Sequence, residues 1–281
     1  MILKDPSPDE YNAFKDFLES ACGILLGENK QYLVKSRLHK IMEAEKSDSL
    51  ADLVNRLKPG LASLNSGLRE SVIDAMTTNE TLWFRDNHPF RILSDIIIPE
   101  ISEKIGAQPM RIWSAACSTG QEPYSVAMIV DEYKRARPAG LRGGVNIVAT
   151  DISRRVLENA KTGTYEMLAI GRGLSTERQE RYFRKNPDGL WQVNREIQKS
   201  VDFRVLNLLE GYSSLGKFDV IFCRNVLIYF SADLKKDILS RMHGALKPGG
   251  YLVLGASESL NTLTDKYEMV HCSPGIIYRA K

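Results

Sequence analysis

The chain has 281 residues, of which 43% are hydrophobic, 26% are charged and 8% are aromatic, and its formal net charge is +3. This composition excludes collagen-like, disulfide-rich and intrinsically disordered proteins, and the length allows one or two domains. A net charge this small does not by itself indicate a nucleic-acid partner, and we expect none.

The first residues contain Asp5, Asp9 and Glu10, where a signal peptide would need an apolar stretch. No apolar run approaches the roughly 18 to 20 residues of a membrane span, so we expect no membrane insertion. The cysteines are widely spaced and form no C-x-x-C pair; they are Cys22, Cys117, Cys223 and Cys272. We therefore expect reduced thiols, no metal site and a cytoplasmic location.

Residues 1–76 predict an all-α N-terminal domain. Ser7, Pro8 and Glu10 form a capping box with proline at the first helical position, and apolar residues then recur at helical spacing up to Leu25. We expect this first helix to end at Gly27. Three more helices are expected, from about Lys30 to Lys46, from Ser49 to a stop at Pro59-Gly60, and from Leu68 to Met76.

From about residue 110, short apolar strands alternate with helices. The expected strands are Met110–Trp113, Val145–Ala149, Val201–Val205, Phe218–Phe222 and Tyr251–Leu254, and the expected helices are Glu122–Arg137, Arg154–Lys161 and Ala232–Leu246. This alternation predicts an α/β fold, a doubly wound Rossmann-like parallel sheet covered on both faces. The tail around Ser273-Pro274-Gly275 predicts a terminal antiparallel hairpin.

A polar stretch between Thr162 and Ser200 is too long for a plain connection between a helix and a strand. We expect a small inserted β subdomain at about 163–200. Within it, Asp188-Gly189 lies between Tyr182-Phe183 and Leu190–Val193, which predicts a hairpin.

The first two expected strands run into candidate ligand-binding loops. Small residues from Ser114 to Gly120 would let a ligand approach the backbone, although the pattern is not G-x-G-x-x-G, which weakens a dinucleotide interpretation. Asp151, which follows the second strand, could accept hydrogen bonds from both ribose hydroxyls, or it could cap the next helix. Together the loops favour a nucleoside, and they leave methyltransferases and dehydrogenases both open.

The later strands add further candidates. Asn207 follows the third strand, where its amide could meet an adenine edge, and the polar residues after the fourth strand are site candidates rather than core. The segment Leu246–Leu252, L-K-P-G-G-Y-L, resembles a turn that recurs before a strand in class I methyltransferases. This resemblance argues against a dehydrogenase.

Several segments together resemble the chemotaxis receptor methyltransferases, the CheR family. They are T-T-N-E-T-L-W-F-R from Thr77, W-S-A-A-C-S-T-G-Q-E-P-Y-S from Trp113, A-T-D-I-S from Ala149 and R-N-V-L-I-Y-F from Arg224. The resemblance covers nearly the whole chain. One departure is Gln121, where the family more often has glutamate, and whether it alters a cofactor contact is open.

The resemblance implies a class I methyltransferase domain over 77–281 that uses S-adenosylmethionine and releases S-adenosylhomocysteine. The implied activity is protein-glutamate O-methylation of chemotaxis receptors, giving methyl esters for sensory adaptation. The implied cofactor-binding residues are Asn79, Thr81, Arg85, Glu122, Asp151, Asn207, Leu208, Arg224 and Asn225. Arg85 and Tyr229 would flank the methyl group and the substrate; alternatively, Arg85 caps a helix and Tyr229 packs in the core.

The implied partners are the cytoplasmic methylation helices of chemoreceptors. A basic cluster on the second expected helix could dock an acidic helical bundle, or it could be an ordinary solvated face; its residues are Lys30, Lys35, Arg37 and Lys40. The best-known relatives also grip a receptor's C-terminal pentapeptide with a glycine-rich loop. Because the corresponding segment Arg184–Gly189 is short, we expect no pentapeptide binding here.

Two other functions stay open on sequence alone. One is methylation of nucleic acid or small molecules, which only the generic fold supports. The other is binding of S-adenosylmethionine without catalysis, against which the presence of both Arg85 and Tyr229 argues.

Overall fold

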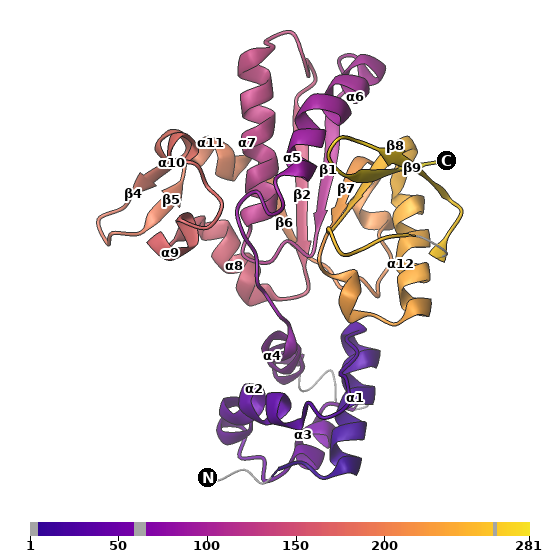
Figure 1. Cartoon of the computed structure of the whole chain (residues 1–281). Helices are drawn as coiled ribbons and strands as arrows, with labels where there is room; N and C mark the ends of the chain where they lie inside the picture. The colour runs from indigo at the N-terminus through magenta and orange to yellow at the C-terminus, as the bar shows by residue number, and fades with distance from the viewer. Residues whose placement is uncertain (1–4, 59–65, 261–262) are drawn as a thin grey trace.

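The computed structural model describes residues 5–58, 66–260 and 263–281, and it divides into a helical N-terminal part and a larger α/β part (Figure 1). The helices of the N-terminal part are α1 (Pro8–Cys22), α2 (Gln31–Ala44), α3 (Leu50–Arg56) and α4 (Ser66–Met76). Their apolar faces meet in one core, in which Phe14, Leu18 and Leu38 are fully buried. The all-α expectation for this region is confirmed, while Pro59-Gly60, the expected stop of α3, lies outside the described residues.

The first helix begins as expected but ends earlier. The Ser7 hydroxyl accepts a hydrogen bond from the Glu10 N–H at 3.3 Å, and the Glu10 carboxylate accepts one from the Ser7 N–H at 2.9 Å. The predicted end at Gly27 is wrong, because Gly23 takes the left-handed conformation, with φ 78°, and closes the helix. A β-carbon at Gly23 would lie 2.5 Å from Leu234 Cδ2, so glycine also permits a close approach to a distant helix.

The α/β part is built on a seven-stranded sheet of order β6-β2-β1-β7-β8-β10-β9. The strands are β1 (Met110–Ala115), β2 (Val145–Asp151), β6 (Val201–Val205), β7 (Phe218–Cys223), β8 (Leu246–Leu254), β9 (Tyr267–His271) and β10 (Ile276–Ala280). β6, β2, β1, β7 and β8 pair in parallel, whereas β10 and β9 add antiparallel pairs. Residues on β1 alternate between two cores: Ile112 packs on one face and Trp113 on the other. The doubly wound fold and the terminal hairpin are confirmed.

Helices cover both faces of the sheet (Figure 1). They are α5 (His88–Ile92), α6 (Ile98–Ile105), α7 (Gln121–Ala136), α8 (Arg154–Thr162) and α12 (Ala232–Ala245), with a π-helix, η2 (Leu93–Ile97), between α5 and α6 and a short 3-10 turn, η3 (Ser213–Leu215), before β7. No element is predicted from the sequence for residues 86–109, where α5, η2 and α6 lie. Among the described helices, none combines the length and the apolar composition needed to cross a bilayer.

The segment expected to form a turn before the last parallel strand belongs to that strand. Leu246 pairs with Phe218 and Tyr251 pairs with Val220, so the extra residues between Leu246 and Tyr251 form a bulge within β8. Gly249, with φ 72°, supplies a backbone conformation that the bulge needs.

The inserted segment forms a three-stranded antiparallel sheet of order β3-β5-β4, as expected. Its elements are β3 (Thr164–Tyr165), α9 (Met167–Ile170), α10 (Thr176–Tyr182), β4 (Phe183–Lys185), β5 (Trp191–Val193) and α11 (Arg195–Lys199). The predicted hairpin is β4–β5, although Tyr182 ends α10 rather than starting a strand. The Trp83 ring makes edge-to-face contacts with two aromatic rings of this sheet. Its centroid lies 4.9 Å from that of Tyr165 and 5.1 Å from that of Phe183.

We predict that Gly23→Ala destabilises the protein, because it places a side chain in left-handed backbone and against Leu234. A loss of about 1–3 kcal/mol in the free energy of unfolding is expected from such overpacking, measured by urea denaturation. Gly27→Ala is the matched control, since a β-carbon there meets nothing within 4 Å. Equal stability of the two variants would contradict the assignment of Gly23 as the tightly packed helix end.

Candidate active site

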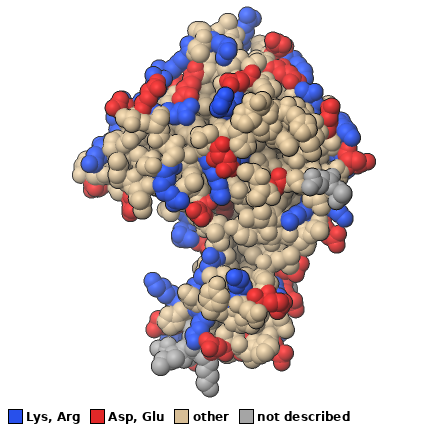
Figure 2. All heavy atoms as spheres, viewed as in Figure 1, with Lys and Arg blue, Asp and Glu red and all other residues tan. Residues whose placement is uncertain are grey.

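A pocket lies at the carboxyl ends of β1, β2, β6 and β7, which is the usual ligand position in an open α/β sheet. Its remaining wall comes from the end of α1 and from residues 76–85, which connect the helical part to the sheet. Figure 2 shows an indentation between the two parts of the molecule, with Lys and Arg atoms on its rim. The pocket is open to solvent, as a ligand-binding site must be.

Asp151, at the end of β2, is 6% exposed and connects two loops of the pocket. One carboxylate oxygen accepts from the Ser118 N–H at 2.8 Å and the other from the Ser153 N–H at 3.0 Å. Burial raises the pKa of Asp151, and these backbone hydrogen bonds oppose the increase. The alternative that Asp151 caps α8 is wrong, because Ser153 is the N-cap residue and accepts from Val156 N–H.

The loop after β1 is held in place by the same carboxylate. Ala116 and Ser118 both have left-handed backbone, with φ 58° and 52°, which non-glycine residues adopt only when contacts compensate. The Ser118 hydroxyl donates to the Asn79 carbonyl at 2.9 Å, so this loop also fixes the connecting segment.

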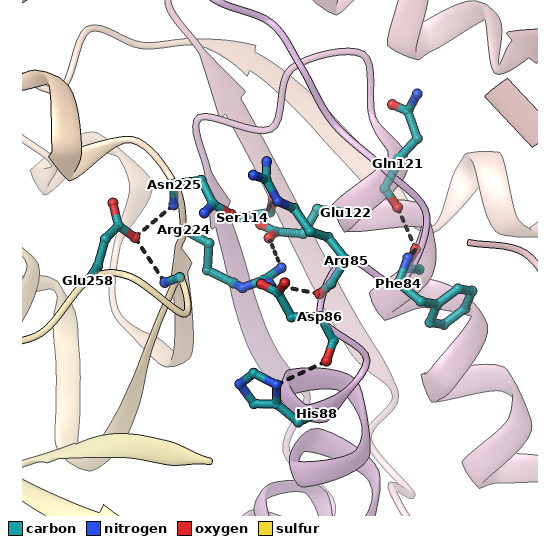
Figure 3. A network of polar contacts seen from close by, with 12 residues as sticks. Phe84, Arg85, Asp86, His88, Ser114, Gln121, Glu122, Arg224, Asn225 and Glu258 are labelled. Atoms are coloured by element: carbon teal, nitrogen blue, oxygen red, sulfur yellow. Dashed lines mark hydrogen bonds and ion pairs between the residues drawn. The ribbon is translucent and has the colours of Figure 1, made fainter. Parts of the chain in front are cut away.

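Arg224, directly after β7, is the central charge of the site (Figure 3). Its side chain is 2% exposed, and its Nη atoms lie 3.0 Å from Glu122 Oε2 and 2.7 Å from Asp86 Oδ2. It also donates to the Arg85 carbonyl at 2.7 Å, and Glu122 accepts from the Ser114 hydroxyl at 2.8 Å. A buried guanidinium is tolerable only with such partners, so these contacts fix three segments of chain against one another.

Arg85 and Tyr229 both line the pocket and are neither fully buried nor fully exposed. Arg85 donates to the Glu80 carbonyl at 3.4 Å, and Figure 3 shows its side chain extending away from the Asp86–Arg224 pair. Tyr229 ends the 3-10 turn η4 (Leu227–Tyr229), and its carbonyl accepts from Leu25 N–H at 2.9 Å. Tyr229 thus lines the pocket and also packs, partly buried, against the core that contains Phe230, and Arg85 contacts a loop carbonyl in the segment before α5.

The other predicted cofactor-binding residues also line this pocket; they are Asn79, Thr81, Glu122, Asp151, Asn207, Leu208, Arg224 and Asn225. The Asn207 amide has partners on both sides: its nitrogen donates to the Ala21 carbonyl at 2.9 Å, and its oxygen accepts from Leu209 N–H at 3.1 Å. Gln121 stands where the family more often has glutamate, and its effect on a cofactor contact stays a question. Gln121 accepts from the Thr119 hydroxyl and does not line the pocket.

Sequence analysis missed the contribution of the N-terminal part to this pocket. Cys22 and Ile24 form part of the wall, although they precede Asn207 by more than 180 residues. Burial raises the pKa of the Cys22 thiol to about 11, so the thiol stays protonated at neutral pH. No local signal marks either residue, because their position depends on how α1 docks.

The four predicted substrate-docking residues lie on or beside α2 and do not line the pocket. Lys35 pairs with Asp5 at 2.7 Å, whereas Lys30 and Lys40 are exposed. Arg37 donates to the Met76 and Thr77 carbonyls at 2.7 and 3.2 Å. Arg37 therefore attaches α2 to the segment that enters the pocket.

Comparison with known proteins covers both parts of the chain. Residues 9–77 match the family described as "CheR methyltransferase, all-alpha domain", and residues 79–276 match "CheR methyltransferase, SAM binding domain". Chemotaxis protein methyltransferase 1 of Pseudomonas aeruginosa is 58% identical over 272 residues, which are 97% of this chain and 98% of that protein. Chemotaxis protein methyltransferase Cher2 of Pseudomonas putida is 59% identical with the same coverage. Chemotaxis protein methyltransferase 1 of Vibrio cholerae is 54% identical over 275 residues, 98% of each chain.

We predict that Asp151→Ala weakens binding of S-adenosylhomocysteine by about 1.5–3 kcal/mol, the usual cost of losing hydrogen bonds to a charged group. Isothermal titration calorimetry measures the change, and circular dichroism shows whether the variant folds. Asp16→Ala, at an exposed carboxylate on α1, is the control. An unchanged affinity in a folded Asp151→Ala variant would exclude Asp151 as a binding residue.

Proposed function

Because the chain belongs to the CheR family of methyltransferases, we propose that it methylates glutamate γ-carboxylates of chemotaxis receptors, forming methyl esters for sensory adaptation. The observation that carries the proposal is the convergence of Arg85, Tyr229 and the predicted cofactor-binding residues on one pocket. The names of the relatives support a role in chemotaxis.

The residues of the pocket fit S-adenosylmethionine. Each Asp151 oxygen accepts one backbone hydrogen bond and retains lone pairs for ribose hydroxyls. Leu208 supplies an apolar wall for the adenine, with Asn207 beside it. Glu122 can hold the amino group of the methionine part, and Arg224, whose buried Nε has no hydrogen-bond partner among the described residues, closes that end together with Asn225.

The proposed reaction needs no general base from the protein. A glutamate with an ordinary pKa of about 4.3 is already ionised at neutral pH. The bound cofactor supplies an electrophilic methyl group on its sulfonium. The protein's task is to hold the carboxylate in line and to exclude water.

Arg85 and Tyr229 are suited to that task because both line the pocket. Desolvation of the incoming carboxylate is costly without a partner, and the Arg85 guanidinium lowers this cost. The Tyr229 hydroxyl can donate to one carboxylate oxygen and orient the other. Complete neutralisation would weaken the nucleophile, so orientation matters more here than a tight ion pair.

The α2 surface is a reasonable docking site for an acidic receptor helix, although not through all four predicted cations. Lys30 and Lys40 are exposed, so they can attract an acidic partner from solution. Lys35 and Arg37 already have partners within the chain. We therefore propose Lys30 and Lys40 as the docking charges, with Arg37 in a supporting role.

We also propose that receptor recognition does not require a C-terminal pentapeptide. A peptide that extends the inserted sheet needs free backbone groups at an edge strand such as β4. The Phe183 carbonyl already accepts from the Arg184 guanidinium at 2.7 Å. The adjoining turn is closed by hydrogen bonds from Asn186 N–H to the Leu190 carbonyl and from Gly189 N–H to the Asn186 carbonyl, at 2.8 and 3.0 Å.

The test of the proposed function is incubation with receptor and S-adenosylmethionine labelled in the methyl group. We expect base-labile label on receptor glutamates, located by mass spectrometry. Arg85→Ala should nearly abolish transfer, and Tyr229→Phe should lower kcat about tenfold with little change in cofactor affinity. Label on RNA or on a small molecule, or near-normal transfer by Arg85→Ala, would contradict the proposal.

The recruitment proposal is tested by titrating a receptor C-terminal pentapeptide into the protein. We expect no detectable heat, because the Phe183 carbonyl on β4 already accepts a hydrogen bond from Arg184 and the adjoining turn is closed. Arg184→Ala, which frees the Phe183 carbonyl, is the comparison variant. Micromolar binding of the peptide to the unaltered protein at the inserted sheet would show that recruitment does use the tail.

A further inference from the structure

The segment that carries Tyr229 has a backbone conformation that needs external support. It leaves β7 at Arg224 and turns at Asn225, which has φ 57°, a left-handed value that costs energy for a residue other than glycine. The segment then forms η4, in which Tyr229 N–H donates to the Val226 carbonyl at 3.2 Å. The position of the Tyr229 hydroxyl therefore depends on what fixes residues 225–227.

One carboxylate fixes them. Glu258 accepts from the backbone N–H groups of Asn225 at 2.7 Å, Val226 at 3.0 Å and Leu227 at 2.8 Å. It also accepts from Gly255 N–H at 2.9 Å (Figure 3 shows Glu258 beside Asn225). Successive backbone N–H groups of this kind form a concave site for an anion, and here the anion is a side chain of the same chain. Hydrogen bonds to an ionised acceptor are stronger than those between neutral groups.

The surroundings of Glu258 are arranged for this contact. A β-carbon at Gly255 would lie 2.7 Å from Glu258 Oε2 and 2.9 Å from Asn225 N, so only glycine lets the carboxylate and the loop approach so closely. Glu258 does not line the pocket, and it is separated from Asn225 by 33 positions. It therefore has no route to the ligand except through the loop it binds.

We propose that Glu258 is a positioning residue for methyl transfer, acting through Tyr229. Its carboxylate holds the loop of residues 225–227, and η4 carries this placement to Tyr229. The Tyr229 carbonyl also accepts from Leu25 N–H at 2.9 Å, so the same loop receives the N-terminal part. The effect of Glu258 on methyl transfer rests on the proposed function. Whether Glu258 holds the loop of residues 225–227 can be measured without substrate.

The substrate-free measurement is hydrogen–deuterium exchange in Glu258→Gln. This change keeps the side-chain shape but places an NH₂ group where backbone N–H groups require an acceptor. We expect faster exchange at residues 225–227 and at Gly255, with little change in α2 and α3. Glu103→Gln, at an exposed glutamate on α6, is the matched control and should leave exchange unchanged. Unchanged protection of residues 225–227 in Glu258→Gln would overturn the proposal.

The kinetic measurement is a double-mutant cycle with Tyr229→Phe. In the otherwise unaltered enzyme, Glu258→Gln should lower kcat at least about tenfold. In the Tyr229→Phe variant the same change should lower kcat less than about threefold, because the effects of two residues that act as a unit do not add. A general loss of stability would instead reduce both backgrounds equally, and that result would refute action through Tyr229. If Glu258→Gln does not fold, Gly255→Ala displaces the same carboxylate and must show the same coupling. If the unaltered enzyme forms no methyl ester, the proposed function fails, while the exchange measurement still decides whether Glu258 holds the loop.

Discussion

The site depends on one buried charge, the Arg224 guanidinium, which forms ion pairs with Glu122 and Asp86. A charge that is 2% exposed would be strongly unfavourable without partners, so the end of β7, the start of α7 and the segment after Arg85 must come together for the fold to form. The backbone around it is unusual: Phe84 and Asp86 both have positive φ, at 48° and 69°. The ion pairs and the hydrogen bond to the Arg85 carbonyl compensate the energetic cost of these positive φ angles. They also hold Arg85 at the pocket.

The second constraint is that neither part of the chain forms the pocket alone. The end of α1 contacts the α/β part through the Asn207 amide, and Leu25 N–H donates to the Tyr229 carbonyl. On the other side, Arg155 on α8 pairs with Asp74 on α4 at 2.5 Å. The connecting segment between these contacts lines the pocket itself. We therefore expect cofactor binding and docking of the helical part to be coupled, because the same short stretch of backbone lines the pocket and contacts the helical part.

Sequence reasoning succeeded where the signal is local. Apolar runs located the parallel strands, and the small-residue loop and Asp151 could be placed because parallel strands bring their carboxyl ends to one edge. Prediction failed where a contact between residues far apart in the sequence determines the local structure. Gly23 rather than Gly27 ends α1, at a point where its left-handed backbone packs closely against Leu234 of a distant helix, and Arg37 on α2 donates hydrogen bonds to the connecting segment. The helical segment from α5 to α6 was missed altogether, although Pro89 and Pro99 each stand in the first turn of a helix there.

The distribution of charge around the pocket is consistent with a site that binds S-adenosylmethionine and, as proposed, a substrate carboxylate. Asp151 is satisfied by backbone N–H groups, and Glu122 and Arg224 neutralise each other in part. Arg85, by contrast, contacts the neutral Glu80 carbonyl, so its positive charge remains available to an anion at the pocket. The groups proposed to hold the cofactor thus already have partners within the protein, whereas Arg85, proposed to lie beside the substrate carboxylate, has only a neutral one among the contacts of the described residues. In the proposed reaction, this separation would let the protein stabilise an anionic nucleophile without supplying a base and without a second charge that would neutralise it.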